Sequence, residues 1–89
     1  MNYYGVKREI YKNNGKMPYE TTIMPNLFKD EEKAFKWAMH DSDQTGLRYG
    51  YTWVDATTQL QTVRNSKTGK DTTYRHEWSV IKFNMEEEQ

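Results

Sequence analysis

The chain contains no cysteine among its 89 residues. Disulfide bonds and thiolate metal sites are therefore excluded, and secreted domains of this size more often carry disulfides. No apolar run reaches the length of a membrane span or of a signal peptide. These absences predict an intracellular, cytoplasmic protein that does not associate with membranes.

Large apolar residues are also scarce, because Leu, Ile, Val and Phe together account for 13 of the 89 positions. So low a content marks disorder when the net charge is high, but here 13 basic and 13 acidic residues cancel. Aromatic residues reach 15%, and each ring buries a large area. We therefore expect one folded domain, residues 1–84, whose core relies on rings and methionine, followed by an acidic tail, residues 85–89.

The zero net charge conceals a segregation along the chain. Residues 1–18 carry a net charge of +3, residues 19–45 carry −3, residues 46–83 carry +3, and the terminal "EEE" adds −3. Attraction of the whole protein to nucleic acid is not supported, although one basic surface is compatible with this distribution.

The first two segments form a predicted β-hairpin. Residues 3–12 alternate between apolar and polar, and "NNGK" follows. A type I′ turn at Asn14-Gly15, where both positions need positive φ, pairs Ile10 with Tyr19 and Val6 with Ile23. The proline at position 18 makes the second strand an edge strand near the turn.

A helix of about three turns is expected next. Asp30 is a favourable N-cap, and "EEKAFKWAMH" places Ala34, Phe35, Ala38 and Met39 on one apolar stripe. The polar residues and the glycine of "DSDQTG", Asp41–Gly46, then end this helix.

Three further strands are expected after Gly46. Residues 47–53 alternate clearly. Residues 59–65 are read as strand because of the threonines at positions 57, 58, 62 and 68, although Asp55 as an N-cap leaves a short helix open. Residues 72–83 form the last strand. Its apolar residues change face near Ser79, which predicts either a bulge or burial on both faces.

The resulting order, β-β-α-β-β-β, predicts an α+β fold. Its simplest form is an antiparallel sheet of four to five strands with one α-helix packed on one face.

Motifs for metal binding or catalysis are weak. "DSDQTG" resembles the start of a calcium loop, but position twelve is Thr52, which cannot supply the bidentate carboxylate. Zinc would need His40 and His76 together with carboxylates. The serines lie in no nucleophile elbow, and no glycine-rich phosphate loop is present. We predict no metal, no cofactor and no catalytic residue.

Cations and rings in the second half suggest a surface for a macromolecular partner. The residues assigned to it are Arg48, Tyr51, Arg64, Lys67, Lys70 and Arg75. The expected function is a small non-enzymatic module that binds protein as an inhibitor, adaptor or accessory protein, of the kind phages and mobile elements encode. The alternative is nucleic-acid binding by the basic, aromatic C-terminal hairpin. Homodimerisation through a sheet edge also stays open.

The two strands joined by "NNGK" and the following "LFKDEEKAFKWA" resemble the start of the arm-type DNA-binding domains of tyrosine recombinases. The resemblance covers residues 3–39. That family places three strands before its helix, whereas here three follow it, so the chain is not assigned to the family.

Overall fold

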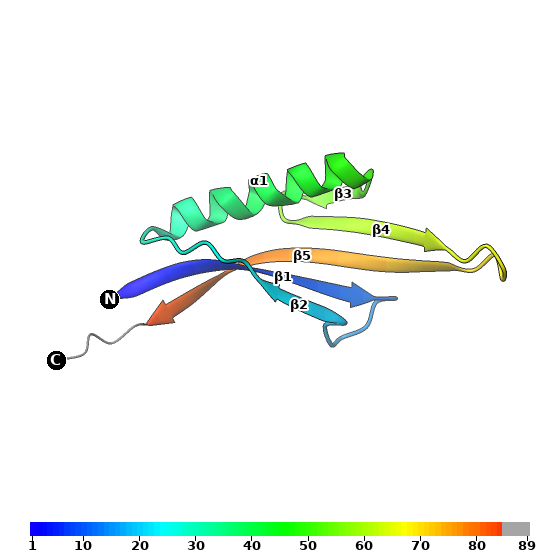
Figure 1. Ribbon diagram of the computed structural model, residues 1–89, viewed down its shortest axis with the longest axis horizontal. Helices are drawn as coiled ribbons and strands as arrows, with labels where there is room; N and C mark the ends of the chain where they lie inside the picture. The colour runs from blue at the N-terminus through cyan, green and yellow to red at the C-terminus, as the bar shows by residue number, and fades with distance from the viewer. Residues whose placement is uncertain (85–89) are drawn as a thin grey trace.

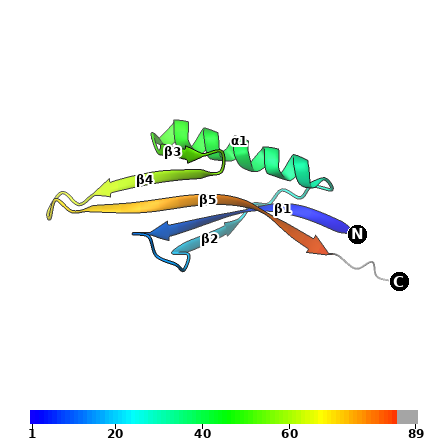
Figure 2. The same cartoon turned by 180° about the vertical axis from the view of Figure 1, so that it is seen from behind.

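The computed structural model describes residues 1–84 as a five-stranded antiparallel sheet with one helix on one face (Figures 1 and 2). The elements are β1 (Asn2–Lys12), β2 (Glu20–Ile23), α1 (Glu31–Tyr49), β3 (Thr52–Asp55), β4 (Thr58–Arg64) and β5 (Asp71–Asn84). The strand order is β2-β1-β5-β4-β3. The predicted fold class is confirmed, and of the predicted strand over residues 59–65, residues 59–64 lie in β4. The predicted acidic tail, residues 85–89, lies outside the described residues.

The core lies between the helix and the two long central strands. Val6, Ala34, Ala38 and Trp78 are almost fully buried there. Val6 stands opposite Val80 in the β1–β5 pair, and both point to the helix side. Around this cluster pack five partly buried side chains, namely those of Tyr4, Met24, Phe28, Trp37 and Val80. Rings and one methionine therefore dominate the partly buried shell, as expected, whereas the almost fully buried centre consists of small aliphatic side chains and one ring, that of Trp78.

The helix is longer than the sequence pattern predicted. Asp30 does cap it, since its Oδ1 accepts the Glu32 N–H at 2.9 Å, but the helix runs through "DSDQTG" and ends at Gly50 in the left-handed conformation, with φ 69°. The interpretation of Asp41–Gly46 as the helix end was wrong. The predicted strand over residues 47–53 was wrong for the same reason, because β3 begins only at Thr52.

Small side chains on one side of α1 explain how close the helix lies to the sheet. Ala34, Ala38, Ser42 and Gly46 are its buried residues, and they recur every fourth position. Residues four apart lie on one face of a helix. Phe35 falls off this line and remains 46% exposed, so its predicted place on the buried stripe was wrong.

The predicted register of the first hairpin was wrong by one residue. Ile10 pairs with Glu20 and Lys7 with Ile23. The residues with positive φ are Asn13 and Asn14, whereas Gly15 is not among them. The tight turn thus lies one residue earlier, and the irregular residues 15–19 precede β2. The shift exposes Ile23 and turns the neighbouring Met24 toward the core.

The last strand is continuous, so the bulge proposed near Ser79 is absent. Its register with β1 is unbroken from Asn2–Asn84 to Lys12–Tyr74. The second alternative, burial on both faces, holds instead. Ile81 stands opposite Gly5 and is half-buried, and the Phe83 ring lies so close that a Cβ at Gly5 would meet it at 2.9 Å.

Among residues 1–84, no helix combines the length and apolar character needed to cross a bilayer.

Candidate functional site

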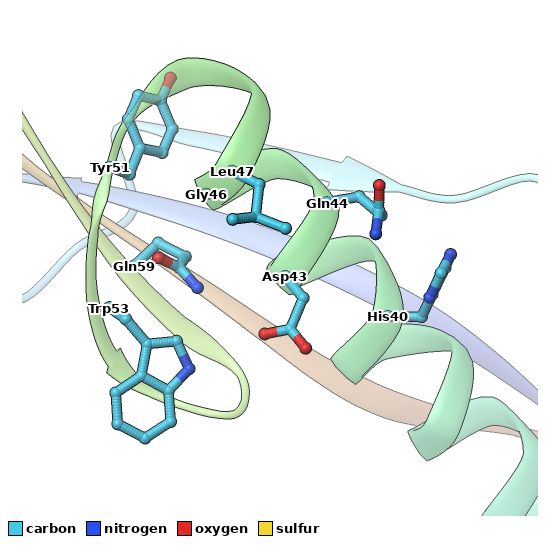
Figure 3. A pocket seen from close by; sticks show the side chains of 8 residues that line it. All are labelled: His40, Asp43, Gln44, Gly46, Leu47, Tyr51, Trp53 and Gln59. Atoms are coloured by element: carbon cyan, nitrogen blue, oxygen red, sulfur yellow. The ribbon is translucent and has the colours of Figure 1, made fainter.

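A groove lies between the C-terminal half of α1 and strands β3 and β4 (Figure 3). Its volume is about 310 Å³. Eight residues line it: His40, Asp43, Gln44, Gly46, Leu47, Tyr51, Trp53 and Gln59. We refer to this feature as the β3 groove.

Helix spacing produces one wall of the β3 groove and the edge strand produces the other. His40, Asp43 and Leu47 follow one another at three and four residues, so they share one side of α1. Leu47 is 79% exposed and Trp53 is 61% exposed, and Figure 3 shows them on opposite sides of the hollow. Val54, beside Trp53, is 47% exposed. Three large apolar side chains therefore face solvent around one short strand, where folding alone does not bury them.

The floor of the β3 groove is a buried polar contact. Gln59 is 1% exposed, and its Nε2 donates to the Ser42 hydroxyl oxygen at 3.3 Å. A Cβ at Gly46 would lie 2.6 Å from Gln59 Oε1. Glycine at position 46 is therefore required by space under the helix, and the Gln59 side chain occupies that space.

The backbone of β3 is open on its outer side. The Trp78 N–H donates to the Thr57 carbonyl oxygen at 2.9 Å, so position 57 faces β5. In antiparallel strands, successive residues turn their N–H and C=O groups to alternate sides. The backbone groups of Leu60 therefore face β3, and those of its partner Thr52 face β4. Trp53 accordingly directs its N–H and C=O away from the sheet, where no further strand of the described chain lies.

Negative charge flanks this open edge. Asp43 stands on the helix wall, and Asp55 ends β3. The backbone N–H of Thr57, which donates to Asp55 Oδ1 at 2.9 Å, holds the pKa of Asp55 below its ordinary value. The edge therefore carries carboxylate charge at neutral pH next to exposed apolar surface.

A row of stacked rings runs from the end of α1 to β5, and Tyr51 is its member in the β3 groove. Tyr49, Tyr51, His76 and Trp78 follow one another with centroid separations of 5.6, 5.0 and 6.1 Å. His76 is 4% exposed, and burial lowers the pKa of its imidazole to about 4, with the positive charge of Arg8 acting in the same direction. The ring is therefore neutral at physiological pH, and its Nε2 lies 2.9 Å from Gln61 Oε1.

The six residues predicted to bind a partner do not form one surface. Lys67 and Lys70 lie in the turn between β4 and β5, at the end of the molecule farthest from α1 (Figure 1). Arg64 pairs with Asp71 at 3.3 Å. Arg75 lies on the face opposite the helix, where it pairs with Glu77 at 3.2 Å and stacks over Tyr11.

The remaining two predicted residues lie near the end of α1. Arg48 stacks over Tyr49, with its guanidinium carbon 5.6 Å from the ring centroid. Tyr51 is the one predicted residue that lines the β3 groove.

Sequence reasoning missed most of the β3 groove. The sequence pattern predicted one strand over residues 47–53, whereas Leu47 belongs to α1 and Trp53 to β3, so the exposure of these two side chains around a groove was not foreseen. The signal that could have found them is the spacing of Ala34, Ala38, Ser42 and Gly46, which continues the helix and leaves Leu47 beside the buried line. Gly50 then supplies the stop.

Within residues 1–84, no three His, Asp or Glu side chains come together in a way that could hold a metal ion. "DSDQTG" is helical throughout, so its oxygens cannot wrap around a calcium ion as a loop does. The arrangement around β3 suits the binding of an extended chain, through backbone hydrogen bonds and an apolar groove.

Comparison of the chain with models of protein families, with curated proteins and with solved structures gave no match.

Proposed function

We propose that this chain is a small, non-enzymatic, cytoplasmic module that binds a protein partner by adding an extended segment of that partner to β3. The observation that carries the proposal is the coincidence, at one strand, of an outward-facing backbone at Trp53 with the exposed side chains of Trp53, Val54 and Leu47. Strand addition uses both features, because backbone bonds give affinity and side-chain pockets give specificity.

The two edges of the sheet differ in a way that favours β3. At the other edge, β2 carries Glu20, Thr21 and Thr22, ends in the exposed Ile23 and is followed closely by Pro25. Charge and proline are the means by which proteins protect an edge from further pairing. The β3 edge instead presents tryptophan and valine at its centre, and its charged residue, Asp55, stands at its end.

The chemistry of the groove defines the partner segment. A stretch of about four residues matches β3, which has four residues and a register irregularity between Trp53 and Asp55. One apolar side chain of the segment would enter the hollow between Leu47 and Trp53. A lysine or arginine beside it would meet the charges of Asp43 and Asp55, so we propose a basic, apolar, extended segment.

The distribution of cations supports protein over nucleic acid as the partner. Arg64 and Arg75 are occupied by carboxylates, which leaves Lys67 and Lys70 as the basic pair at the hairpin tip. Two lysines neutralise few phosphates, and the resulting binding would fall steeply with salt. The absence of cysteine in so small a chain supports the proposed cytoplasmic location, because small secreted domains more often carry disulfides.

The experiment is selection of displayed random dodecapeptides on the immobilised protein, followed by affinity measurements with synthetic peptides. We expect enrichment of peptides with alternating apolar residues flanked by lysine or arginine. Trp53→Ser and Leu47→Ser should weaken binding at least tenfold, because each removes a wall of the groove. The matched control is Met17→Ser, which removes an equally exposed apolar side chain, 80% exposed, outside the groove.

Two results would contradict the proposal. One is the absence of enriched peptides, or peptides that bind Trp53→Ser as well as the wild type. The other is tight binding of DNA or RNA at physiological salt that is lost when Lys67 and Lys70 are changed to Glu, which would place the nucleic-acid function first.

A further inference from the structure

A second hollow lies on the other side of α1, between the helix and strands β1 and β2. Its volume is about 340 Å³, which falls in the size range of small-ligand sites. Eight residues line it: Arg8, Thr22, Met24, Asp41, Gln44, Thr45, Arg48 and Tyr49. Gln44 is the one residue that lines both this hollow and the β3 groove, so the two are separate surfaces. We refer to this second feature as the arginine hollow.

Two arginines of the hollow form no ion pair with a carboxylate of residues 1–84. Arg8 stands opposite Trp78, with its guanidinium carbon 5.5 Å from the ring centroid. Arg48 approaches from the last turn of the helix. Among residues 1–84, the ion pairs are Lys7–Glu9, Lys36–Glu32, Arg64–Asp71 and Arg75–Glu77, so neither Arg8 nor Arg48 forms one.

The Nε of Arg8 is also buried without a hydrogen-bond acceptor in the described chain. Buried donors nearly always have a partner, and leaving one unpaired, above all in a charged group, is costly. Arg8 lines the arginine hollow, so an anion bound there would explain why its Nε–H has no acceptor in the described chain.

The other groups of the hollow fit an oxyanion with several oxygens. Thr22 and Thr45 supply hydroxyl donors, and Gln44 supplies an amide. Asp41 is the one acid, and its Oδ2 is bound by the indole N–H of Trp78 at 2.8 Å. Two guanidiniums against one carboxylate leave the lining with a net charge of +1.

We infer that the arginine hollow binds a small phosphate monoester, with Arg8 and Arg48 holding the phosphate oxygens. The planar guanidinium is suited to this role because it donates in parallel to two oxygens of one phosphate. Phosphate offers more acceptor oxygens than a carboxylate does to the donors of this lining.

The test is a thermal-shift and calorimetric titration of the full chain with inorganic phosphate, O-phosphoserine, glucose 6-phosphate and adenosine 5′-monophosphate. Serine, glucose and adenosine are the neutral controls, and acetate tests whether any oxyanion suffices. We expect at least one phosphate ester to raise the melting temperature, since a ligand of the native state stabilises it. Neither the neutral compounds nor acetate should do so at the same concentration.

Variants then assign the binding to these residues. Arg48→Met, at an exposed position, should weaken binding at least tenfold, and Arg8→Lys, which keeps the charge but loses the planar fork, should weaken it as well. Arg64→Met is the matched control, because it removes an arginine elsewhere, and binding should be unchanged. In an NMR titration, the Nε–H resonance of Arg8 should shift with the ester.

The inference is overturned if no ester stabilises the protein beyond its neutral parent, if Arg48→Met binds as tightly as the wild type, or if Arg64→Met weakens binding equally. Trp53→Ser should bind the ester normally, so failure of this inference is distinguishable from failure of the β3 groove as a protein-binding site.

Discussion

Replacing Gly46 by alanine tests how α1 is seated on the sheet. In an exposed helix the change from glycine to alanine stabilises by about 1 kcal/mol. Here the new methyl group would lie 2.6 Å from Oε1 and 2.8 Å from Cδ of Gln59. Gln59 is 1% exposed, so its side chain cannot swing into solvent without moving the helix.

The structure therefore predicts a net loss of stability. Overpacking of a filled site costs about 1–3 kcal/mol, and displacement of Gln59 also breaks its bond to Ser42, worth about 1 kcal/mol. After the gain in helix propensity is subtracted, the expected result for Gly46→Ala is a destabilisation of about 1–3 kcal/mol. The assay is urea unfolding followed by circular dichroism.

A double-mutant cycle shows whether Gln59 is the cause. In a Gln59→Ala background the obstruction is gone, so Gly46→Ala should become stabilising by up to about 1 kcal/mol. Gly50→Ala is the control, because position 50 has φ 69° and open space around it. It should cost about 1–2 kcal/mol in both backgrounds. The reasoning is refuted if Gly46→Ala stabilises the wild type, or if its effect is the same with and without Gln59.

Three further predictions concern the core and the first turn. The free energy of unfolding should fall by up to about 3 kcal/mol as the pH drops from about 6.5 to about 4, because over this range His76 takes up a proton in the unfolded chain but not in the native state. Urea unfolding of His76→Gln should show a smaller fall over the same range. An equal fall would contradict this account. Asp41→Ala should lower the free energy of unfolding by about 1–3 kcal/mol, because it leaves the indole N–H of the buried Trp78 unpaired. Asp43→Ala, two residues away, should cost little in the same assay. Similar losses for the two variants would argue against the indole hydrogen bond. Asn14→Val should lower the free energy of unfolding by about 1–2 kcal/mol and Asn14→Gly by almost nothing, because φ at this position is 59°. If thermal unfolding shows that valine is tolerated, the tight turn lies elsewhere.

The elements of the fold were predictable from the sequence where local signals act alone. Period-two alternation gave the long strands, and Asp30 with two following glutamates gave the helix start. The sheet order was not predictable, because the chain pattern does not say that β1 and β5 meet at the centre.

The errors have two physical causes. At "DSDQTG" the local preference of Asp, Ser and Gly for helix ends was overridden by the packing of Ser42 and Gly46 on Gln59, a residue 13 positions beyond Gly46. In the first hairpin the turn uses Asn13 and Asn14, since asparagine also tolerates positive φ.

The candidate sites depended on these errors. The exposure of Leu47 and Trp53 follows from the true end of the helix, and the pairing of Arg64 and Arg75 with acids follows from the strand register. Neither the exposed side chains nor the ion pairs can be read from a single segment of the sequence. The basic residues were therefore predicted to bind a partner, and the β3 groove was missed.

Amide hydrogen exchange at Trp53 tests the proposed mode of binding most directly. It is measured by NMR on the protein alone and saturated with a dodecapeptide selected as described above. Strand addition predicts that exchange at the Trp53 amide slows at least tenfold in the complex, because its outward N–H gains a carbonyl acceptor, while Thr21 in β2 is unchanged. A peptide that binds tightly but leaves the Trp53 amide exchanging as in the free protein, or protects Thr21 instead, would contradict the account.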